Sequence, residues 1–391
     1  MISLWEFTSP RTIVFGENAL EYLKTIEGTR ALIVTDKVIR KLGFADKVAS
    51  YLKQAGMAVE ILDEVETEPS AENVVKGAEL ARKHCPDWFI GLGGGSCMDA
   101  AKAIWVLYER PDMEVAAINP LEKLGLRKKA RLTCIPTTSG TGSDATWVTM
   151  ITDVKECRKM ELTSREIVAD IAILDPELAK SMPPRVAADT GLDALTHAIE
   201  GYVSQWSNDF SDALAIRAIQ IIFKYLLRAY RNSEDKEAKE KMHNAATMAG
   251  MSFSNSQVGV AHAMGHSLGA IFRVPHGRAV GLFLPYSIEY SARDAAQRYA
   301  DIAREIGIDV ETDEEAVTKL VQAVKKIEHE VGTPGSIKEL GISREDFEKR
   351  LDDLVSRAAN SLCTFMNPRV PEVEDVRKLV TYAYDGKKIN F

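Results

Sequence analysis

The chain has 391 residues, of which 46% are hydrophobic and 27% are charged, enough for two domains with separate cores. The formal net charge of −8 argues against a nucleic-acid partner or an anionic membrane surface, because both attract basic proteins. No uninterrupted apolar run is long enough to span a membrane. We therefore expect a cytoplasmic protein that acts on a small molecule.

The first half of the chain alternates short, β-rich apolar runs with amphipathic helical patterns. Such alternation predicts a mainly parallel sheet, because parallel strands need a long crossover between them. The predicted strands cover residues 31–35, 59–62, 88–92, 132–136 and 171–174.

Long helical patterns dominate the second half, over residues 189–231, over 234–254 and onward to the end of the sequence. The change of pattern falls near the prolines at 183 and 184. We therefore predict an α/β domain over residues 1–183, which holds the glycine-rich segments expected of a dinucleotide-binding domain, and an all-helical domain over residues 184–391, which holds the Asp and His pairs expected of a metal-binding and catalytic domain.

Two glycine-rich loops follow predicted strands. The first is Gly93-Gly94-Gly95-Ser96, and the second, over residues 136–143, is rich in hydroxyl side chains. Glycine lets the backbone approach an anion closely, and the free N–H groups at the start of a following helix stabilise the anion's charge. Either loop alone could be an ordinary strand-to-helix turn, but together they favour a site for the pyrophosphate of a dinucleotide.

Asp36 follows the first strongly predicted strand. An acidic side chain at this place can accept hydrogen bonds from ribose hydroxyls and repel a 2'-phosphate, which favours NAD over NADP. Its order is unusual, because the acidic residue of the ordinary Rossmann pattern follows the glycine loop. A helix amino-cap is the alternative role for this aspartate.

A second group of polar residues predicts a metal site. Asp193 and His197 are four residues apart, as are His262 and His266, so each pair shares one face if its segment is helical. His276 follows ten residues after His266. Each residue alone could be structural, but one carboxylate with several imidazoles suits a divalent metal such as Fe²⁺ or Zn²⁺.

Over essentially its whole length, the sequence resembles the iron-containing alcohol dehydrogenase family. The resemblance rests on residues 93–102, 136–143, 193–200, 262–266 and 275–277. Two details depart from the usual family pattern: Asp144-Ala145 stands where Glu-Val is usual, and 167–170 lacks a usual proline. Neither departure touches the predicted metal ligands.

The resemblance also implies roles for individual residues. It implies that Fe²⁺, or alternatively Zn²⁺, is bound by Asp193, His197, His262 and His276, with His266 as a catalytic residue outside the ligand set. Phe253 and Cys363 are the implied substrate-pocket residues. The residues implied to contact NAD, or alternatively NADP, are Asp36, Gly94, Gly95, Ser96, Asp99, Thr137, Thr138 and Lys159.

The implied activity is that of a metal-dependent alcohol dehydrogenase. It would transfer hydride reversibly between a small primary or secondary alcohol, or its aldehyde or ketone, and NAD(P). A glycerol dehydrogenase-like enzyme with fewer protein ligands and a dehydroquinate synthase-like enzyme, which would need basic residues for a substrate phosphate, are the alternatives. A non-catalytic nucleotide-binding regulator is the alternative from another class. We expect a homodimer, the commonest assembly.

Overall fold

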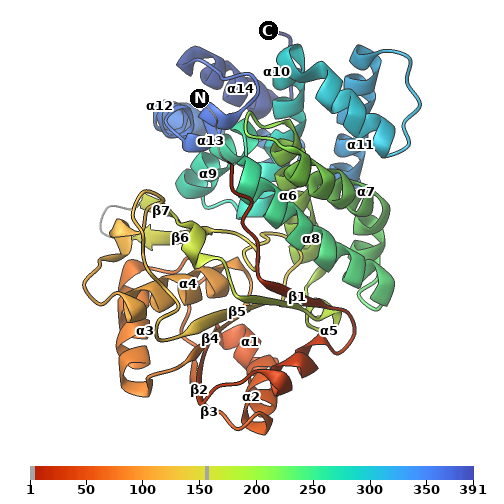
Figure 1. Cartoon of the computed structure of the whole chain (residues 1–391). Coiled ribbons are helices and arrows are strands. Elements are labelled where there is room, and N and C mark those ends of the chain that lie inside the picture. The colour runs from red at the N-terminus through yellow and green to blue at the C-terminus, as the bar shows by residue number, and fades with distance from the viewer. Residues whose placement is uncertain (1–4, 155–157) are drawn as a thin grey trace. The chain divides into compact units, whose positions relative to one another are not determined.

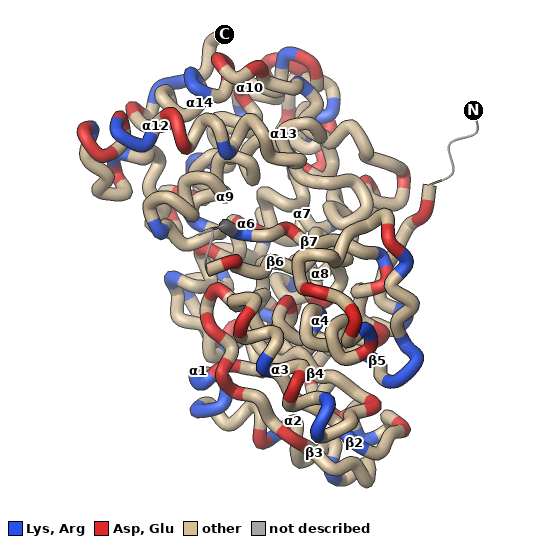
Figure 2. Tube along the Cα trace, turned by 90° about the vertical axis from the view of Figure 1, so that its left-hand side faces the viewer, with Lys and Arg blue, Asp and Glu red and all other residues tan. Residues whose placement is uncertain are grey.

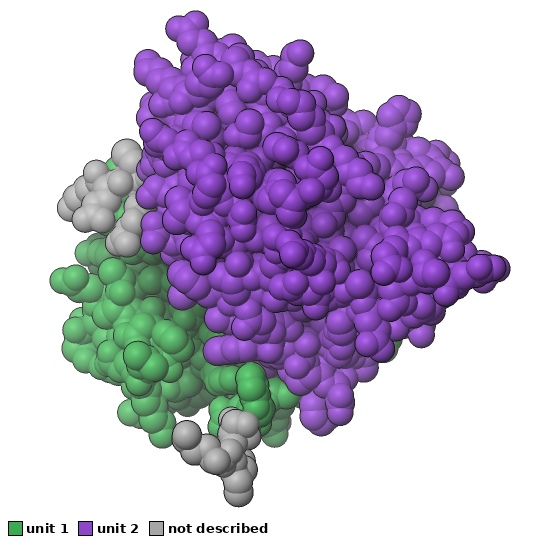
Figure 3. Space-filling view, turned by 90° about the horizontal axis from the view of Figure 1, so that it is seen from above, with its two compact units in different colours: residues 1–182 green, residues 183–391 purple. Residues whose placement is uncertain are grey.

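The computed structural model describes residues 5–154 and 158–391. The chain divides into two compact units, residues 1–182 (unit 1) and 183–391 (unit 2), which Figure 3 distinguishes by colour. The division falls after Met182, whereas the predicted domains divide after residue 183.

Unit 1 is built around a six-stranded sheet in which each recorded strand pair is parallel (Figure 1). All five predicted strands are present, which confirms the expected α/β class. From one edge to the other, the strands are β1 (Thr12–Phe15), β8 (Ile171–Leu174), β5 (Arg131–Pro136), β4 (Trp88–Gly93), β2 (Arg30–Val34) and β3 (Ala58–Leu62).

Helices cover both faces of this sheet, because successive strand residues point to opposite sides. Leu32 and Val34 of β2 belong to the core that includes α3 and α4, whereas Ala31 and Ile33 belong to the core that includes η1 and α2. The helices of unit 1 are η1 (Ala19–Thr25), α1 (Lys37–Lys41), α2 (Phe44–Gln54), α3 (Ala71–His84), α4 (Gly95–Glu109), η2 (Val115–Ala117), η3 (Arg165–Ile167) and α5 (Pro176–Ala179).

The direction of strand addition reverses at β2, which pairs with β3 on one side and with β4 on the other. In open α/β sheets, ligands bind at the carboxyl ends of the strands where the order reverses. Asp36 follows β2, and the two glycine-rich loops follow the neighbouring strands β4 and β5. The fold thus gathers the predicted nucleotide-contacting segments at one edge of the sheet.

Three strands were not predicted. β1 is a four-residue, partly exposed edge strand, too short to show a clear pattern. β6 (Val148–Asp153) and β7 (Arg158–Thr163) form an antiparallel pair apart from the main sheet. Polar residues such as Thr149 and Thr152 interrupt the apolar pattern of β6.

Unit 2 is helical in its described residues, as predicted, with α6 packed against α7, α8 and α10. The long helical pattern of residues 189–231 is divided, because Asn208 forms a capping box that starts α7. The helices are α6 (Pro184–Val203), α7 (Asp209–Arg231), α8 (Lys236–Ser256), α9 (Val260–Phe272), α10 (His276–Glu305), α11 (Asp313–Glu330), η4 (Lys338–Leu340), α12 (Arg344–Ala359), α13 (Leu362–Met366) and α14 (Val373–Asp385).

Helix hydropathy and the distribution of charged residues can both be described for this fold. Among the residues that the structure describes, no helix is both long and apolar enough to cross a membrane. Figure 2 shows acidic and basic residues interspersed along both units.

Candidate functional site

Helix α6 presents two of the predicted metal ligands. Pro184 occupies its first turn, where a missing N–H costs no helical hydrogen bond. Asp193 and His197 lie one turn apart in the helix interior and are 1% and 5% exposed. A carboxylate this deeply buried needs a compensating partner.

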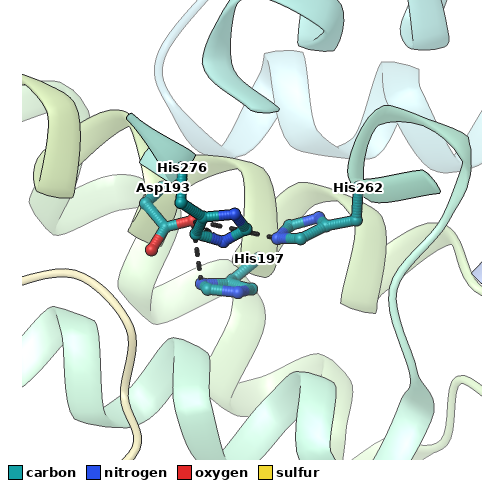
Figure 4. Close-up of side chains that lie close together, drawn as sticks. All are labelled: Asp193, His197, His262 and His276. Atoms are coloured by element: carbon teal, nitrogen blue, oxygen red, sulfur yellow. Dashed lines mark ion pairs between the residues drawn. The ribbon is translucent and has the colours of Figure 1, made fainter. Parts of the chain in front are cut away.

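His262 of α9 and His276, the first residue of α10, complete the group, and Figure 4 shows the four side chains pointing toward one another. Their ligand atoms all lie within 4.8 Å of one another. Oδ1 of Asp193 lies 3.2 Å from Nε2 of His276, 3.8 Å from Nε2 of His262 and 3.9 Å from Nδ1 of His197. Ligands in a tetrahedral site with bonds of about 2.1 Å would be about 3.4 Å apart. The group is therefore close to the size of a divalent metal site.

Unsatisfied polar atoms support the same conclusion. Nε2 of His262 and Oδ1 of Asp193 are buried, and neither has a hydrogen-bond partner of good geometry among the described residues. Buried polar atoms are normally satisfied, and an ion is one explanation when they are not. Three imidazoles and one carboxylate suit Fe²⁺ or Zn²⁺, so these residues fit a divalent metal.

The charge state of Asp193 also fits a cation site. Burial opposes its charge and raises its pKa, but the nearby imidazoles of His197, His276 and His262 more than offset this and hold the pKa well below its usual range. The carboxyl group therefore stays ionised at neutral pH and available to a cation.

His266 lies beside the four-residue group. Its ring centroid is 5.7 Å from that of His262 and 5.1 Å from that of His276, with which it stacks. His266 is not among the four residues whose ligand atoms converge.

The two predicted pocket residues come together next to the metal ligands. Phe253 of α8 stacks on the ring of His197 at 4.1 Å between centroids. The same phenylalanine packs against a small cluster that contains Cys363 and Ala263, the neighbour of His262. An apolar wall therefore flanks this part of the site.

In unit 1, the start of α4 fits a phosphate group. Gly94 is the N-cap and supplies no side-chain cap, so the first N–H groups of this 15-residue helix remain available to an anion. A β-carbon at Gly94 would meet nothing nearer than the side chain of Thr138 at 3.7 Å, so protein packing alone does not require glycine there. The N–H of Thr137 donates to the carbonyl of Gly93 at 2.9 Å and ties the second loop to the first.

Four of the predicted nucleotide-contacting residues, Asp36, Lys159, Asp99 and Ser96, also have structural contacts. Oδ1 of Asp36 accepts hydrogen bonds from the N–H groups of Val38 and Ile39, so Asp36 caps α1. Lys159 pairs with Glu68 at 2.7 Å. Asp99, 8% exposed, accepts a hydrogen bond from the hydroxyl of Ser143 at 2.5 Å and so holds the second glycine-rich loop. Ser96 donates to the carbonyl of Thr67 at 2.5 Å.

Glu200 was not among the predicted site residues, yet its carboxylate lies 2.6 Å from Nδ1 of His262. A signal was present in the sequence, because Glu200 follows His197 by three residues and so shares its helix face. The partner helix of that face could not be identified from spacing alone.

Comparison with known proteins agrees with the fold. Residues 10–176 match the family model described as iron-containing alcohol dehydrogenase, and residues 187–384 match the C-terminal model of the Fe-containing alcohol dehydrogenase family. An NADPH-dependent butanol dehydrogenase of Clostridium saccharobutylicum is 42% identical over 99% of this chain and 100% of its own length. A lactaldehyde reductase of Escherichia coli is 37% identical over 91% of this chain and 92% of its own length.

A solved structure shows the same architecture. The iron-containing alcohol dehydrogenase of Thermococcus thioreducens superposes with a TM-score of 0.89 and 32% identity, over 98% of this chain and 100% of its own. The matches cover both units, including all four residues of the candidate metal centre. The chain therefore belongs to the iron-containing alcohol dehydrogenase family and is a metal-dependent alcohol dehydrogenase.

Proposed function

We propose that this protein transfers hydride reversibly between a small primary or secondary alcohol, or its aldehyde or ketone, and NAD, with Fe²⁺ held by Asp193, His197, His262 and His276. The observation that carries the proposal is the convergence of these four side chains, whose ligand atoms lie within 4.8 Å of one another. Two of these atoms, Oδ1 of Asp193 and Nε2 of His262, are buried with no hydrogen-bond partner of good geometry among the described residues. The carboxylate keeps the site hard enough for iron, and Zn²⁺ is the alternative metal.

A divalent metal would supply Lewis acidity that lowers the pKa of an alcohol hydroxyl, and a nicotinamide would supply the hydride acceptor. His266, next to the ligand group but outside it, is placed to carry the released proton. Phe253 and Cys363 would contact the carbon chain of the substrate and exclude water from it. These apolar neighbours favour an alcohol with an apolar carbon chain, in keeping with the butanol named for one relative.

NAD is proposed over NADP because Asp36 follows β2 at the point where the strand order reverses, and its charge would repel a 2'-phosphate. The butanol dehydrogenase relative, by contrast, is named as NADPH-dependent. Gly94, Gly95, Ser96, Thr137 and Thr138 are the proposed pyrophosphate contacts, with Asp99 holding the second loop and Lys159 near the cofactor. A cytoplasmic location and a homodimer remain predictions from the sequence.

The experiment that tests this function begins with anaerobic purification and measurement of bound iron and zinc. Oxidation of NADH and NADPH is then followed with butanal, lactaldehyde and longer aldehydes, with and without added Fe²⁺. We expect turnover that depends on Fe²⁺ and prefers NADH. The His262→Ala variant serves as the matched control and should lose metal and turnover together. An active variant without bound metal would overturn the ligand assignment.

A further inference from the structure

The geometry points to Glu200 as a positioning residue that fixes the ring proton of His262 and so prepares the opposite ring nitrogen for the metal. The inference rests on the proposed function, because it concerns the same metal centre. Glu200 lies on α6 and His262 on α9, and each is 2% exposed.

The carboxylate of Glu200 faces three N–H groups of the first turn of α9. Oε1 accepts from the backbone N–H of Ala261 at 2.6 Å, and Oε2 lies 3.4 Å from the backbone N of His262. Oε2 also lies 2.6 Å from Nδ1 of the His262 ring. Both carboxylate oxygens face backbone N–H donors and so act as acceptors, which places the ring proton of His262 on Nδ1.

The position of the ring proton decides whether His262 can bind a metal. With the proton on Nδ1, Nε2 of a neutral imidazole carries a free lone pair. Nε2 is the atom that faces Oδ1 of Asp193 at 3.8 Å and has no hydrogen bond among the described residues. A carboxylate behind a ligating histidine also orients the ring and makes it a stronger ligand.

The same carboxylate has a second, purely structural task. Gly259, the N-cap of α9, has no side chain to cap the helix, and a β-carbon there would lie 2.6 Å from Oδ1 of Asn367 and 3.0 Å from Oε1 of Glu200. Asn367 accepts from the N–H of Val260 at 3.2 Å and shares the capping of α9 with Glu200. Any test must therefore separate helix capping from ligand positioning.

Glu200 shares one face of α6 with two of the proposed metal ligands. Asp193, His197 and Glu200 are separated by four and three residues and so share one face of the helix. One helix face therefore provides two ligands directly and orients a third from α9. This arrangement fixes three ligands relative to one another before any metal arrives.

The test compares Zn²⁺ affinity of the wild-type apoprotein and of Glu200→Gln, measured by competition with a chelator. Glutamine keeps the shape of the side chain but has a single acceptor oxygen. It cannot accept from both the Ala261 N–H and Nδ1–H of His262, and its amide can donate to Nδ1 and move the ring proton to Nε2. We expect a 10- to 100-fold weaker Zn²⁺ affinity. Nitrogen NMR of the apoprotein should show the proton on Nδ1 in the wild type and a shift toward Nε2–H in the variant.

Asn367→Ala provides the matched control, because Asn367 caps the same helix but does not touch the ring of His262. We expect this variant to lower the melting temperature and leave the Zn²⁺ affinity of the folded protein within about twofold. If Glu200→Gln fails to fold, Glu200→Asp keeps the acceptor with a shorter reach and should weaken Zn²⁺ binding less than tenfold while keeping the proton on Nδ1.

Two results would overturn the inference: unchanged Zn²⁺ affinity in Glu200→Gln, or equal losses of affinity in Asn367→Ala and Glu200→Gln. Failure of the wild-type apoprotein to bind Zn²⁺ would instead count against the proposed metal site itself. The two failures are therefore distinguishable in one series of titrations.

Discussion

Asp36 shows how one side chain can serve both the fold and cofactor choice. Its Oδ1 caps α1 through two backbone N–H groups, and its Oδ2 lies 3.3 Å from Sγ of Cys97. The helix-cap alternative raised by the sequence is therefore present in the structure. The cap and the proposed repulsion of a 2'-phosphate are compatible, because the cap uses one oxygen and the charge belongs to the whole carboxylate.

Replacing Asp36 with Asn should shift cofactor preference toward NADPH. Asparagine can retain the cap through its oxygen, but it lacks the charge that would repel a 2'-phosphate. We expect the ratio of kcat/KM for NADPH to that for NADH to rise about tenfold, equivalent to about 1.4 kcal/mol. Steady-state kinetics with both cofactors measure it, with Asp36→Ala to report the cost of losing the cap, about 1 kcal/mol. An unchanged ratio in Asp36→Asn would remove Asp36 as the determinant.

His266 should be separable from the four proposed ligands. Replacing it with Ala is expected to leave Fe²⁺ or Zn²⁺ content at the wild-type level while kcat falls about 100-fold, because a proton carrier is lost and no ligand is removed. Metal analysis and kcat are measured on the same preparation, with His262→Ala alongside as the variant that loses metal. Loss of metal from His266→Ala in proportion to activity would show that this histidine is a ligand.

Spacing alone would pair His262 with His266, although His276 is the residue whose side chain converges with it. The shared helix face of Asp193 and His197 could be predicted from sequence, because residues four apart lie on neighbouring turns of a helix. The contact between Glu200 and His262 could not, because it joins residues 62 positions apart on two helices. The hydrogen bond from Ser143 to Asp99 was missed for the same reason. Spacing predicts which residues share a face, but only tertiary packing decides what that face meets.

At the scale of the element, the predictions were best where one pattern ran through a whole segment. The buried strands β2, β4 and β5 are mostly apolar, so their existence was evident from sequence. The partly exposed edge strand β1 has an apolar run of only three residues, and β6 alternates apolar and polar residues, so both were missed. The break between α6 and α7 depends on a cap at Asn208, whose hydrogen bonds with Ser211 are a local detail within a long helical pattern.

Helix α11 contains a buried carboxyl group that should make stability depend on pH. Glu328 is 3% exposed, and its Oε1 has no hydrogen-bond partner among the described residues. Burial raises the pKa of Glu328 well above its usual range, although Lys325 partly opposes the shift. A carboxyl group with a raised folded-state pKa contributes its full stability below the unfolded-state pKa and loses it as pH rises toward the folded-state pKa.

Glu328→Gln should therefore stabilise the protein increasingly as pH rises. Glutamine is neutral at every pH, so the variant avoids the cost of burying an ionised carboxylate or of keeping it protonated. We expect an advantage over wild type of about 1–3 kcal/mol at pH 8 and almost none at pH 4.5. Thermal unfolding across this range measures it, with Glu330→Gln on the same helix as the control, since Glu330 is partly exposed and pairs with Arg231. If the stability advantage of Glu328→Gln did not grow with pH, the raised pKa of Glu328 would be contradicted.

At the scale of the whole molecule, the proposed cofactor contacts and the proposed metal ligands belong to different units. The nucleotide-contacting segments proposed here all belong to unit 1, and the four proposed ligands, His266 and the two pocket residues all belong to unit 2. The change of sequence pattern near residue 183 falls close to the division between the two units, because parallel strands and long helices have different hydrophobic periods. Bound metal and bound cofactor should consequently stabilise different units.

Amide hydrogen exchange, measured once with Zn²⁺ and once with NADH, should show this division. Zn²⁺ at 100 times its dissociation constant stabilises the bound state by about 2.7 kcal/mol, and that protection should concentrate in α6, α9 and the first turn of α10, which hold the ligands. NADH should instead slow exchange at the start of α4 and over residues 137–143. The His262→Ala variant should lose the Zn²⁺ effect and keep the NADH effect. Protection by Zn²⁺ confined to unit 1 would mean that the metal binds elsewhere, because none of the four converging side chains lies in that unit.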